Sequence, residues 1–506
     1  IFSSADMPQQ PGMMVVGAIM SQGKSLDQGE AALLKEVARL RDAPPSAAEV
    51  SEAKNELIAG KLRERETIDG RAFALGYALR TSGDPADAND DIAALQAVTP
   101  AQIQAVARKY LSEASRMTIR YQAEADRKGP GPAPAPTLIP ASVPYTGPVV
   151  TLAPEGQRMA PPPVGTPVDP VLPSPVEKTL KNGLRVIVAQ SSRLPLVSAD
   201  LTLRVGAFAD PEGRAGTASL TAGMLTEGTT TRSAQDIARQ TEAMGANLSA
   251  DAGQEFASVS LNVMPGSLKK AIGLMADVAR NPAFAKEELE RQRSQTLDGL
   301  SVAYQSPGQI SAFALSPILY GNTPFGHVAG GTPASVEKIQ VSDLSAIHQR
   351  YFRPDNAILV ISGDITPKAA FRLAEKTFGD WKAPSEPRPT TPVIEASTQA
   401  RQVVVDLAGT GQASVSVAKV AIPRTDPDYF PGLVTNALLG GGYSARLNQE
   451  IRVKRGLAYG ANSGLSPRRI VGGFTASTQT KNQSAAEVVT LIRNELGRMA
   501  TVPATP

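Results

Sequence analysis

The chain has 506 residues, of which 42% are apolar and 20% are charged, and its net charge is +3 at pH 7. This length predicts about three domains, the balanced charge argues against a dedicated nucleic-acid binder, and no apolar run approaches the roughly 18 residues of a membrane span. Cysteine is absent, which excludes disulfides, thiolate zinc sites and a cysteine nucleophile.

Residues 1–125 read as two helical stretches that each adjoin a strand, and both recur later in the chain. The stretch 15–40 (strand, polar loop, helix) aligns on 473–499. The stretch 95–121 aligns without gaps on the residues from 338, and there we expect an amphipathic helix leading into a strand. In that alignment Ile103 meets Leu344, Tyr110 meets Tyr351 and Leu111 meets Phe352.

These repeats of roughly 200 residues indicate duplicated domains. Four segments are expected: the C-terminal part of a preceding domain (1–125), a Pro-rich, polyproline-like linker (126–176), a complete domain (177–390) and the N-terminal part of a final domain (391–506). The chain begins at Ile1 rather than Met and stops at Pro506, just after a helical run. We therefore expect both ends to be cuts, so that the chain is a fragment.

The complete domain alternates strand and helix signals. Asn182-Gly183 lies between two apolar runs, which predicts a hairpin with a type I′ turn, and Ser233 with Asp236 predicts a capped helix start. Residues 247–264 predict two strands, followed by helices near 267–280 and 285–305. Hairpin connections mixed with long helices favour an α+β fold, with a mainly antiparallel sheet packed with helices in each domain.

One predicted helix in this domain presents an unusually bare face. It lies within GTASLTAGMLTEGT (216–229), and its i, i+3, i+4 positions are Ser219, Ala222 and Gly223. None of these side chains buries much area or carries out chemistry. Such a face needs an explanation from the rest of the chain.

The strongest local signal is LLGGGYSARLNQEIRVKRGLAYG (438–460). Three glycines precede a helix that we expect from about Ser444 to Lys454, and Gly456 supplies its stop. Arg452 and Tyr459 lie on either side of that stop, where both side chains can project the same way. Taken singly, the arginine reads as part of a solvated helix face and the tyrosine as a packing residue.

This stretch resembles the C-terminal signature of the pitrilysin/insulinase family of zinc metallopeptidases, which includes the mitochondrial processing peptidase. The agreeing residues are Gly440 to Gly442, Arg446-Leu447, Ile451-Arg452 and Gly456-Leu457-Ala458-Tyr459. The runs GLRVIV, GRAGTASLTAGML and PDNAILVISGDI of the complete domain are also similar to that family. The resemblance covers nearly everything outside the linker.

The resemblance explains the bare helix. In the family this helix carries His-x-x-Glu-His, in which two histidines bind zinc and the glutamate is the general base. The matching positions here are Ser219, Ala222 and Gly223, and the third ligand, a glutamate, falls near Gly299. The resemblance therefore implies a non-catalytic half without a metal site, and zinc in the full-length enzyme held by residues before Ile1.

The resemblance also assigns roles to the C-terminal motif. Tyr459 would donate its hydroxyl to the carbonyl oxygen as it becomes an oxyanion, and Arg452 would bind backbone carbonyls of the substrate. Gly440, Gly441 and Gly442 are expected at the substrate. The glycines could instead form a phosphate cradle, but no lysine or acidic residue follows at a useful spacing, which favours close backbone approach or a hinge.

We thus expect the non-zinc half of a two-half zinc metalloendopeptidase, which clamps a peptide or an unfolded protein and is inactive alone. Its partner would be a zinc-bearing half, in cis or as a separate subunit, with no nucleic acid and no membrane span. A periplasmic location is expected from family habit. The alternative is an inactive scaffold, or a peptide-binding subunit of the same fold.

Overall fold

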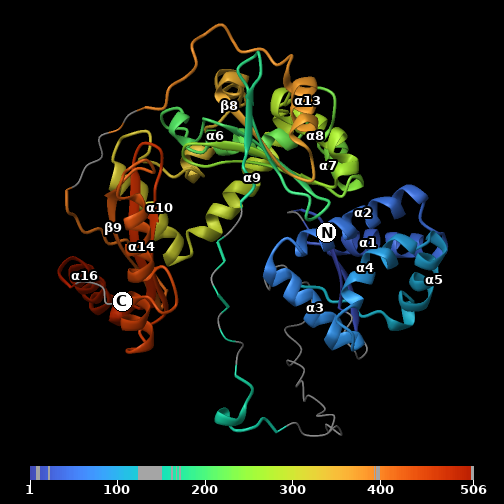
Figure 1. Cartoon of the computed structure of the whole chain (residues 1–506), viewed down its shortest axis with the longest axis horizontal. Helices are drawn as coiled ribbons and strands as arrows, with labels where there is room; N and C mark the ends of the chain where they lie inside the picture. Colours follow the sequence, from blue (N-terminus) through green and yellow to red (C-terminus); the bar gives the residue numbers. More distant parts are fainter. Residues whose placement is uncertain are drawn as a thin grey trace. The chain divides into compact units, whose positions relative to one another are not determined.

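The computed structural model describes residues 1–6, 12–20, 23–122, 151–160, 163, 165–166, 168–169, 172–392, 394 and 399–502. The chain forms two compact units, one made of Ile1–Ala47 and Val98–Pro173 and the other of Ala48–Ala97 and Ser174–Pro506 (Figure 1). Much of the expected linker at 126–176 lies outside the described residues. Its polyproline character and the four expected domain boundaries stay predictions.

In the first unit, β1 (Phe2–Asp6) pairs with β2 (Met13–Gly17) in antiparallel fashion, and α1 (Leu26–Asp42) packs against α5 (Pro100–Tyr110). The expected strand, polar loop and helix at 15–40 are confirmed. The strand expected to follow α5 is wrong, since the described residues up to 122 hold only the short 3-10 turn η1 (Glu113–Ser115) there. A strand needs paired neighbours, and in this unit the described residues offer only the β1–β2 pair.

The second unit begins with three helices, α2 (Ala47–Glu64), α3 (Ile68–Ser82) and α4 (Asp87–Ala97). A six-stranded sheet follows, made of β3 (Val176–Thr179), β4 (Arg185–Gln190), β5 (Val197–Leu203), β6 (Asn247–Ala252), β7 (Ala257–Val263) and β8 (Ala357–Gly363). The strand order is β3-β4-β8-β5-β7-β6, and every pairing except β4–β8 is antiparallel. The predicted α+β fold with a mainly antiparallel sheet is confirmed.

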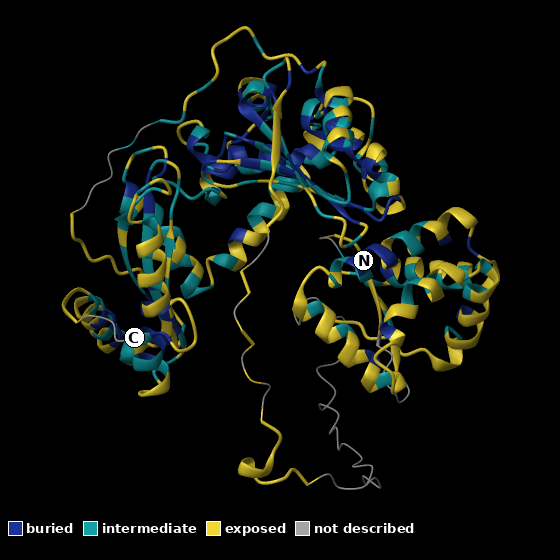
Figure 2. Ribbon diagram, in the orientation of Figure 1, coloured by how far each residue is buried: buried dark blue, intermediate teal, exposed yellow. Residues whose placement is uncertain are grey.

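Alternate residues of β5 and β7 are buried, so one face of this sheet carries the main core (Figure 2). The helices between residues 217 and 378, in chain order, are α6 (Thr217–Gly223), α7 (Ala234–Ala243), α8 (Leu268–Arg280), α9 (Lys286–Ala303), α10 (Pro307–Tyr320), α11 (Pro333–Val336), α12 (Val341–Tyr351) and α13 (Pro367–Phe378). The expected capping box of Ser233 and Asp236 is present at the start of α7.

The hairpin between β3 and β4 exists, but its turn is not type I′. Gly183 has φ +92° whereas Asn182 has a negative φ, and a type I′ turn requires both to be positive. The Leu180 amide donates to the Leu184 carbonyl at 2.8 Å, which leaves a three-residue loop. The side-chain amide of Asn182 instead donates hydrogen bonds to the carbonyls of Phe378 and Trp381. A local sequence pattern cannot predict these contacts, because the partners lie almost 200 residues away.

A second, three-stranded sheet closes the unit. Strands β9 (Gln412–Ala421), β10 (Ala458–Ser466) and β11 (Gly472–Lys481) are antiparallel in the order β10-β11-β9. Helix α14 (Tyr429–Gly440), α15 (Arg446–Asn448), the π-helical turn η8 (Gln449–Val453) and α16 (Ala485–Thr501) pack with this sheet. The order matches β6-β7-β5 of the larger sheet, which supports the expected duplication.

Candidate functional site

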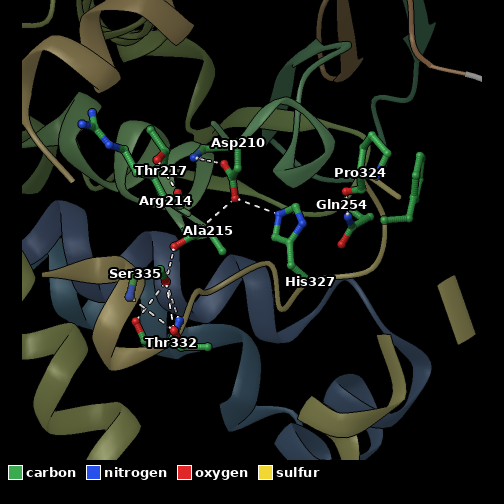
Figure 3. A network of polar contacts seen from close by, with 12 residues as sticks. Asp210, Arg214, Ala215, Thr217, Gln254, Pro324, His327, Thr332 and Ser335 are labelled. Carbon is green, nitrogen blue, oxygen red and sulfur yellow. Dashed lines mark hydrogen bonds and ion pairs between the residues drawn. The ribbon is translucent and has the colours of Figure 1, made fainter. Parts of the chain in front are cut away.

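The start of α6 is closed by a buried carboxylate (Figure 3). Asp210 accepts hydrogen bonds from the amides of Gly216 (2.8 Å) and Ala218 (2.7 Å), and its Oδ2 lies 3.1 Å from Nε2 of His327. The Asp210 side chain is 1% exposed. Asp210 thereby satisfies two of the N–H groups at the start of the helix. The histidine that contacts it lies 117 residues further along the chain.

In the structure, the face of α6 formed by Ser219, Ala222 and Gly223 carries only small side chains. Ser219 and Gly223, one turn apart, are half-buried, whereas Ala222 is 1% exposed. A Cβ placed on Gly223 would meet no atom within 4 Å, and the same holds for the exposed Gly299 on α9. The backbone of this helix could therefore carry larger side chains at Ser219 and Gly223, but the sequence supplies none.

The C-terminal motif begins with a helix whose geometry is irregular. The expected helix from Ser444 starts only at Arg446, and its second turn is π-helical, because the Lys454 amide donates to the Gln449 carbonyl. Its end is as predicted: Gly456 has φ +65°, its amide donates to Arg452, and the Leu457 amide donates to Ile451. A π turn rotates the side chains that follow it and is frequent at functional sites.

Arg452 differs from its basic neighbours in having no carboxylate partner among the described residues. Lys454 binds Glu450 at 2.9 Å and Arg455 also pairs with Glu450. The hydrogen bond from Lys454 holds the pKa of Glu450 below its usual value. Arg452 instead places its guanidinium carbon 4.9 Å from the centroid of the Tyr443 ring. Its N–H donors thus remain available to a ligand.

Tyr459 has an exposed side chain, and hydrogen bonds hold the backbone on either side of it. The side chain is 90% exposed, at the second position of strand β10. On either side of it, Thr480 donates to the Leu457 carbonyl at 2.7 Å and Thr478 donates to the Gly460 carbonyl at 2.6 Å. No described contact joins Tyr459 to Arg452, so their common role stays a prediction.

The three glycines are not equivalent. Gly440 is the buried last residue of α14, and a Cβ there would lie 2.4 Å from the amide nitrogen of Ser463 on β10. A Cβ on Gly441 would lie 2.7 Å from Cα of Ala437, whereas one on Gly442 would meet nothing within 4 Å. Close backbone approach therefore explains Gly440, and the expected contact of all three with substrate stays a prediction.

Known proteins with similar sequences fall into one family. Residues 185–331 match the family described as Insulinase (Peptidase family M16), and residues 338–505 match the Peptidase M16 inactive domain. An uncharacterized zinc protease of Mycobacterium tuberculosis is 30% identical over 308 residues, which cover 59% of this chain and 69% of that protein. The chain belongs to peptidase family M16.

Other M16 relatives differ in what their names assign to them. A protein of Helicobacter pylori named a non-peptidase homolog is 26% identical over 61% of this chain and 71% of its own length. The crystal structure of a peptidase M16 inactive domain from Pseudomonas fluorescens matches with a TM-score of 0.62 and 27% identity, covering 65% of this chain and 80% of that one. A protease structure from Helicobacter pylori, 21% identical, matches with a TM-score of 0.60 over 65% of this chain and 83% of that one and shares the fold.

The zinc of the M16 family does not fit the residues of this chain that correspond to its ligands. Ser219, Ala222, Gly223 and Gly299 together offer a single hydroxyl. Within the described part of the chain, no three His, Asp or Glu side chains are grouped so that they could hold a metal ion. No described helix is both long and apolar enough to cross a membrane.

The sequence alone did not reveal three features of the site. The Asp210–His327 contact joins two loops far apart in the chain. Tyr443 stands directly after the glycines, and only its proximity to Arg452 distinguishes it. The π turn has no local sequence signal.

Proposed function

We propose that this M16 chain is the non-zinc half of a two-half metalloendopeptidase, clamping a peptide or an unfolded protein against an active site whose zinc another half supplies. That half would lie in cis or in a partner subunit, and the location would be the periplasm. The observation that carries the proposal is the pair Arg452 and Tyr459, for which the described residues provide no carboxylate or hydrogen-bond partner. Buried threonines hold the backbone on either side of Tyr459.

The chemistry of the two groups suits an extended peptide. The Tyr459 hydroxyl donates a hydrogen bond to a carbonyl oxygen that gains negative charge, and a donor so placed in a closed site contributes a few kcal/mol. The Arg452 guanidinium, with five N–H donors, binds backbone carbonyls of the peptide. Neither group activates water, so the chain alone binds peptides without cleaving them.

A second role, binding or scaffolding without any hydrolysis, has one observation in its favour: the bare face of α6. The two roles share the peptide-binding step. They separate when a zinc-bearing half is added, because only the peptidase role then yields cleavage.

The test measures binding and cleavage on the same purified chain. A fluorescein-labelled, unstructured peptide of about 20 residues is titrated with the chain, with anisotropy as the readout. We expect saturable binding, no cleavage by mass spectrometry with or without added zinc, and about tenfold weaker binding for Arg452→Ala, which corresponds to about 1.4 kcal/mol.

Arg493→Ala is the matched control, because it removes an exposed arginine on α16 of the same sheet domain. Tyr459→Phe removes the hydroxyl alone and is expected to leave binding nearly unchanged, since that donor acts on the transition state. Absence of binding, or equal loss in Arg452→Ala and Arg493→Ala, would overturn the proposed role of Arg452.

A further inference from the structure

Arg452 contacts a residue that is not among those that carry the family resemblance. Arg452 is half-buried. An arginine without an ion pair samples several rotamers, and fixing them costs binding energy. Here the guanidinium carbon lies 4.9 Å from the ring centroid of Tyr443, within the range of a cation–π contact. This contact engages the ring face and no acceptor atom, so the N–H donors of Arg452 stay free.

The loop that carries Tyr443 is itself held in place. Asn448 is 3% exposed, and its Nδ2 donates to the Tyr443 carbonyl at 2.6 Å. Its Oδ1 accepts a hydrogen bond from the Ala461 amide at 3.3 Å, two residues after Tyr459 on β10. One buried amide thus ties the loop of Tyr443, the helix of Arg452 and the strand of Tyr459 together.

The neighbouring cations have a different kind of partner. Glu450, on the same helical segment, accepts Lys454 and Arg455. Those two cations are neutralised by a carboxylate, whereas Arg452 is held by a neutral ring and keeps its full charge for a ligand. Arg452 lies in the π turn η8, and no ion pair joins it to Glu450 among the described contacts.

We propose that Tyr443 is the positioning residue of this site: its ring holds the Arg452 guanidinium ready for the backbone carbonyls of a peptide. The part of this inference that concerns peptides rests on the proposed function. The part that concerns the orientation of Arg452 does not, and it is measured separately.

The first experiment reads the orientation of Arg452 without any peptide. In the chain labelled with ¹⁵N-arginine, the Nε–Hε signal of Arg452 is assigned by its loss in Arg452→Lys. We expect a ring-current shift of this signal in the native chain and in Tyr443→Phe, and its return to the position of a free arginine in Tyr443→Leu. An unshifted native signal, or one that Tyr443→Leu leaves in place, would overturn the inference.

The second experiment uses the anisotropy titration. Tyr443→Leu is expected to weaken peptide binding about two- to fivefold while Tyr443→Phe retains it, and Tyr443→Leu is expected to add nothing to Arg452→Ala. The matched control is Tyr429→Leu, which removes the ring that lies 3.9 Å from the Arg424 guanidinium in the same domain.

The two readouts separate the two failures. A native chain that shows the shifted Arg452 signal but binds no peptide keeps the positioning inference and removes the proposed function. A chain that binds peptide with equal losses in Tyr443→Leu and Tyr429→Leu removes the inference and keeps the function.

Discussion

Helix α6 and the helical segment that carries Arg452 differ in the polar side chains that they present. At α6 two backbone amides donate to buried Asp210, and the bare face offers only the hydroxyl of Ser219. At the C-terminal helix the last turn is also closed by backbone hydrogen bonds, but among the described residues neither Arg452 nor Tyr459 has a carboxylate or hydrogen-bond partner for its side chain. The difference teaches that the backbone of each helix is held by its own hydrogen bonds, whether or not its side chains can carry out chemistry.

The largest effect that bears on this comparison is expected at Gly440. Gly440→Ala places a Cβ 2.4 Å from the Ser463 amide nitrogen, so α14 and β10 must separate. We expect a loss of about 3 kcal/mol in the free energy of unfolding of the C-terminal domain, measured by urea denaturation. Gly442→Ala is the matched control, because its Cβ meets nothing within 4 Å. Equal stability of the two variants would show that the glycines serve substrate rather than packing.

Asp210 provides the corresponding test at α6. Asp210→Ala removes the acceptor of two helix amides and of His327, and we expect a loss of about 2 kcal/mol, again from urea denaturation. Asp210→Asn keeps one oxygen acceptor and is expected to lose less. A variant as stable as the native chain would mean that α6 does not depend on this cap.

Local patterns predicted those parts of the fold that local physics determines. The strands at 247–264, the capping box at Ser233 and the stop at Gly456 each depend on residues within one or two turns, and all three are confirmed. The strand after α5 failed because a strand also needs partners, which a sequence window does not contain. The turn at Asn182 failed because carbonyls almost 200 residues away compete for its side chain.

The candidate site follows the same division. Arg452, Tyr459 and the bare positions of α6 were found from spacing and resemblance to the family. Tyr443 and Asn448 were missed because their roles arise from contacts across a loop, a helix and a strand. Such contacts become visible only when the backbone is known.

A designed metal site would show whether the backbone of α6 can still place two histidines where both bind one zinc ion. Ser219→His with Gly223→His places two imidazoles one helical turn apart, at half-buried positions where Gly223 has open space. We expect zinc at a few times its Kd to raise the free energy of unfolding of this double variant by about 1 kcal/mol. The change is measured as a higher thermal midpoint. Ser219→His alone is the control and should respond less. No difference between them would mean that the geometry has decayed as well.

The smallest expected effect is a difference between the two sheet domains in how their stability depends on pH. Both histidines of the chain belong to the larger sheet domain, and burial lowers the pKa of His348 from its ordinary 6.5. His348 lies in the last turn of α12, packs on Phe352 and contacts the Ala279 carbonyl at 2.9 Å. Because the folded pKa lies below the unfolded one, the unfolded chain binds more protons between them, and stability falls as pH drops from 6.5 toward the folded pKa.

His348→Gln isolates this contribution, since the glutamine can still donate to Ala279 but does not titrate. We expect the thermal midpoint of the larger domain to fall more steeply with decreasing pH in the native chain than in His348→Gln, when unfolding is followed between pH 5 and 7.5. The described C-terminal domain contains no histidine, and its transition should show the same slope in both proteins. Parallel slopes for the larger domain would mean that His348 titrates alike in the folded and unfolded states.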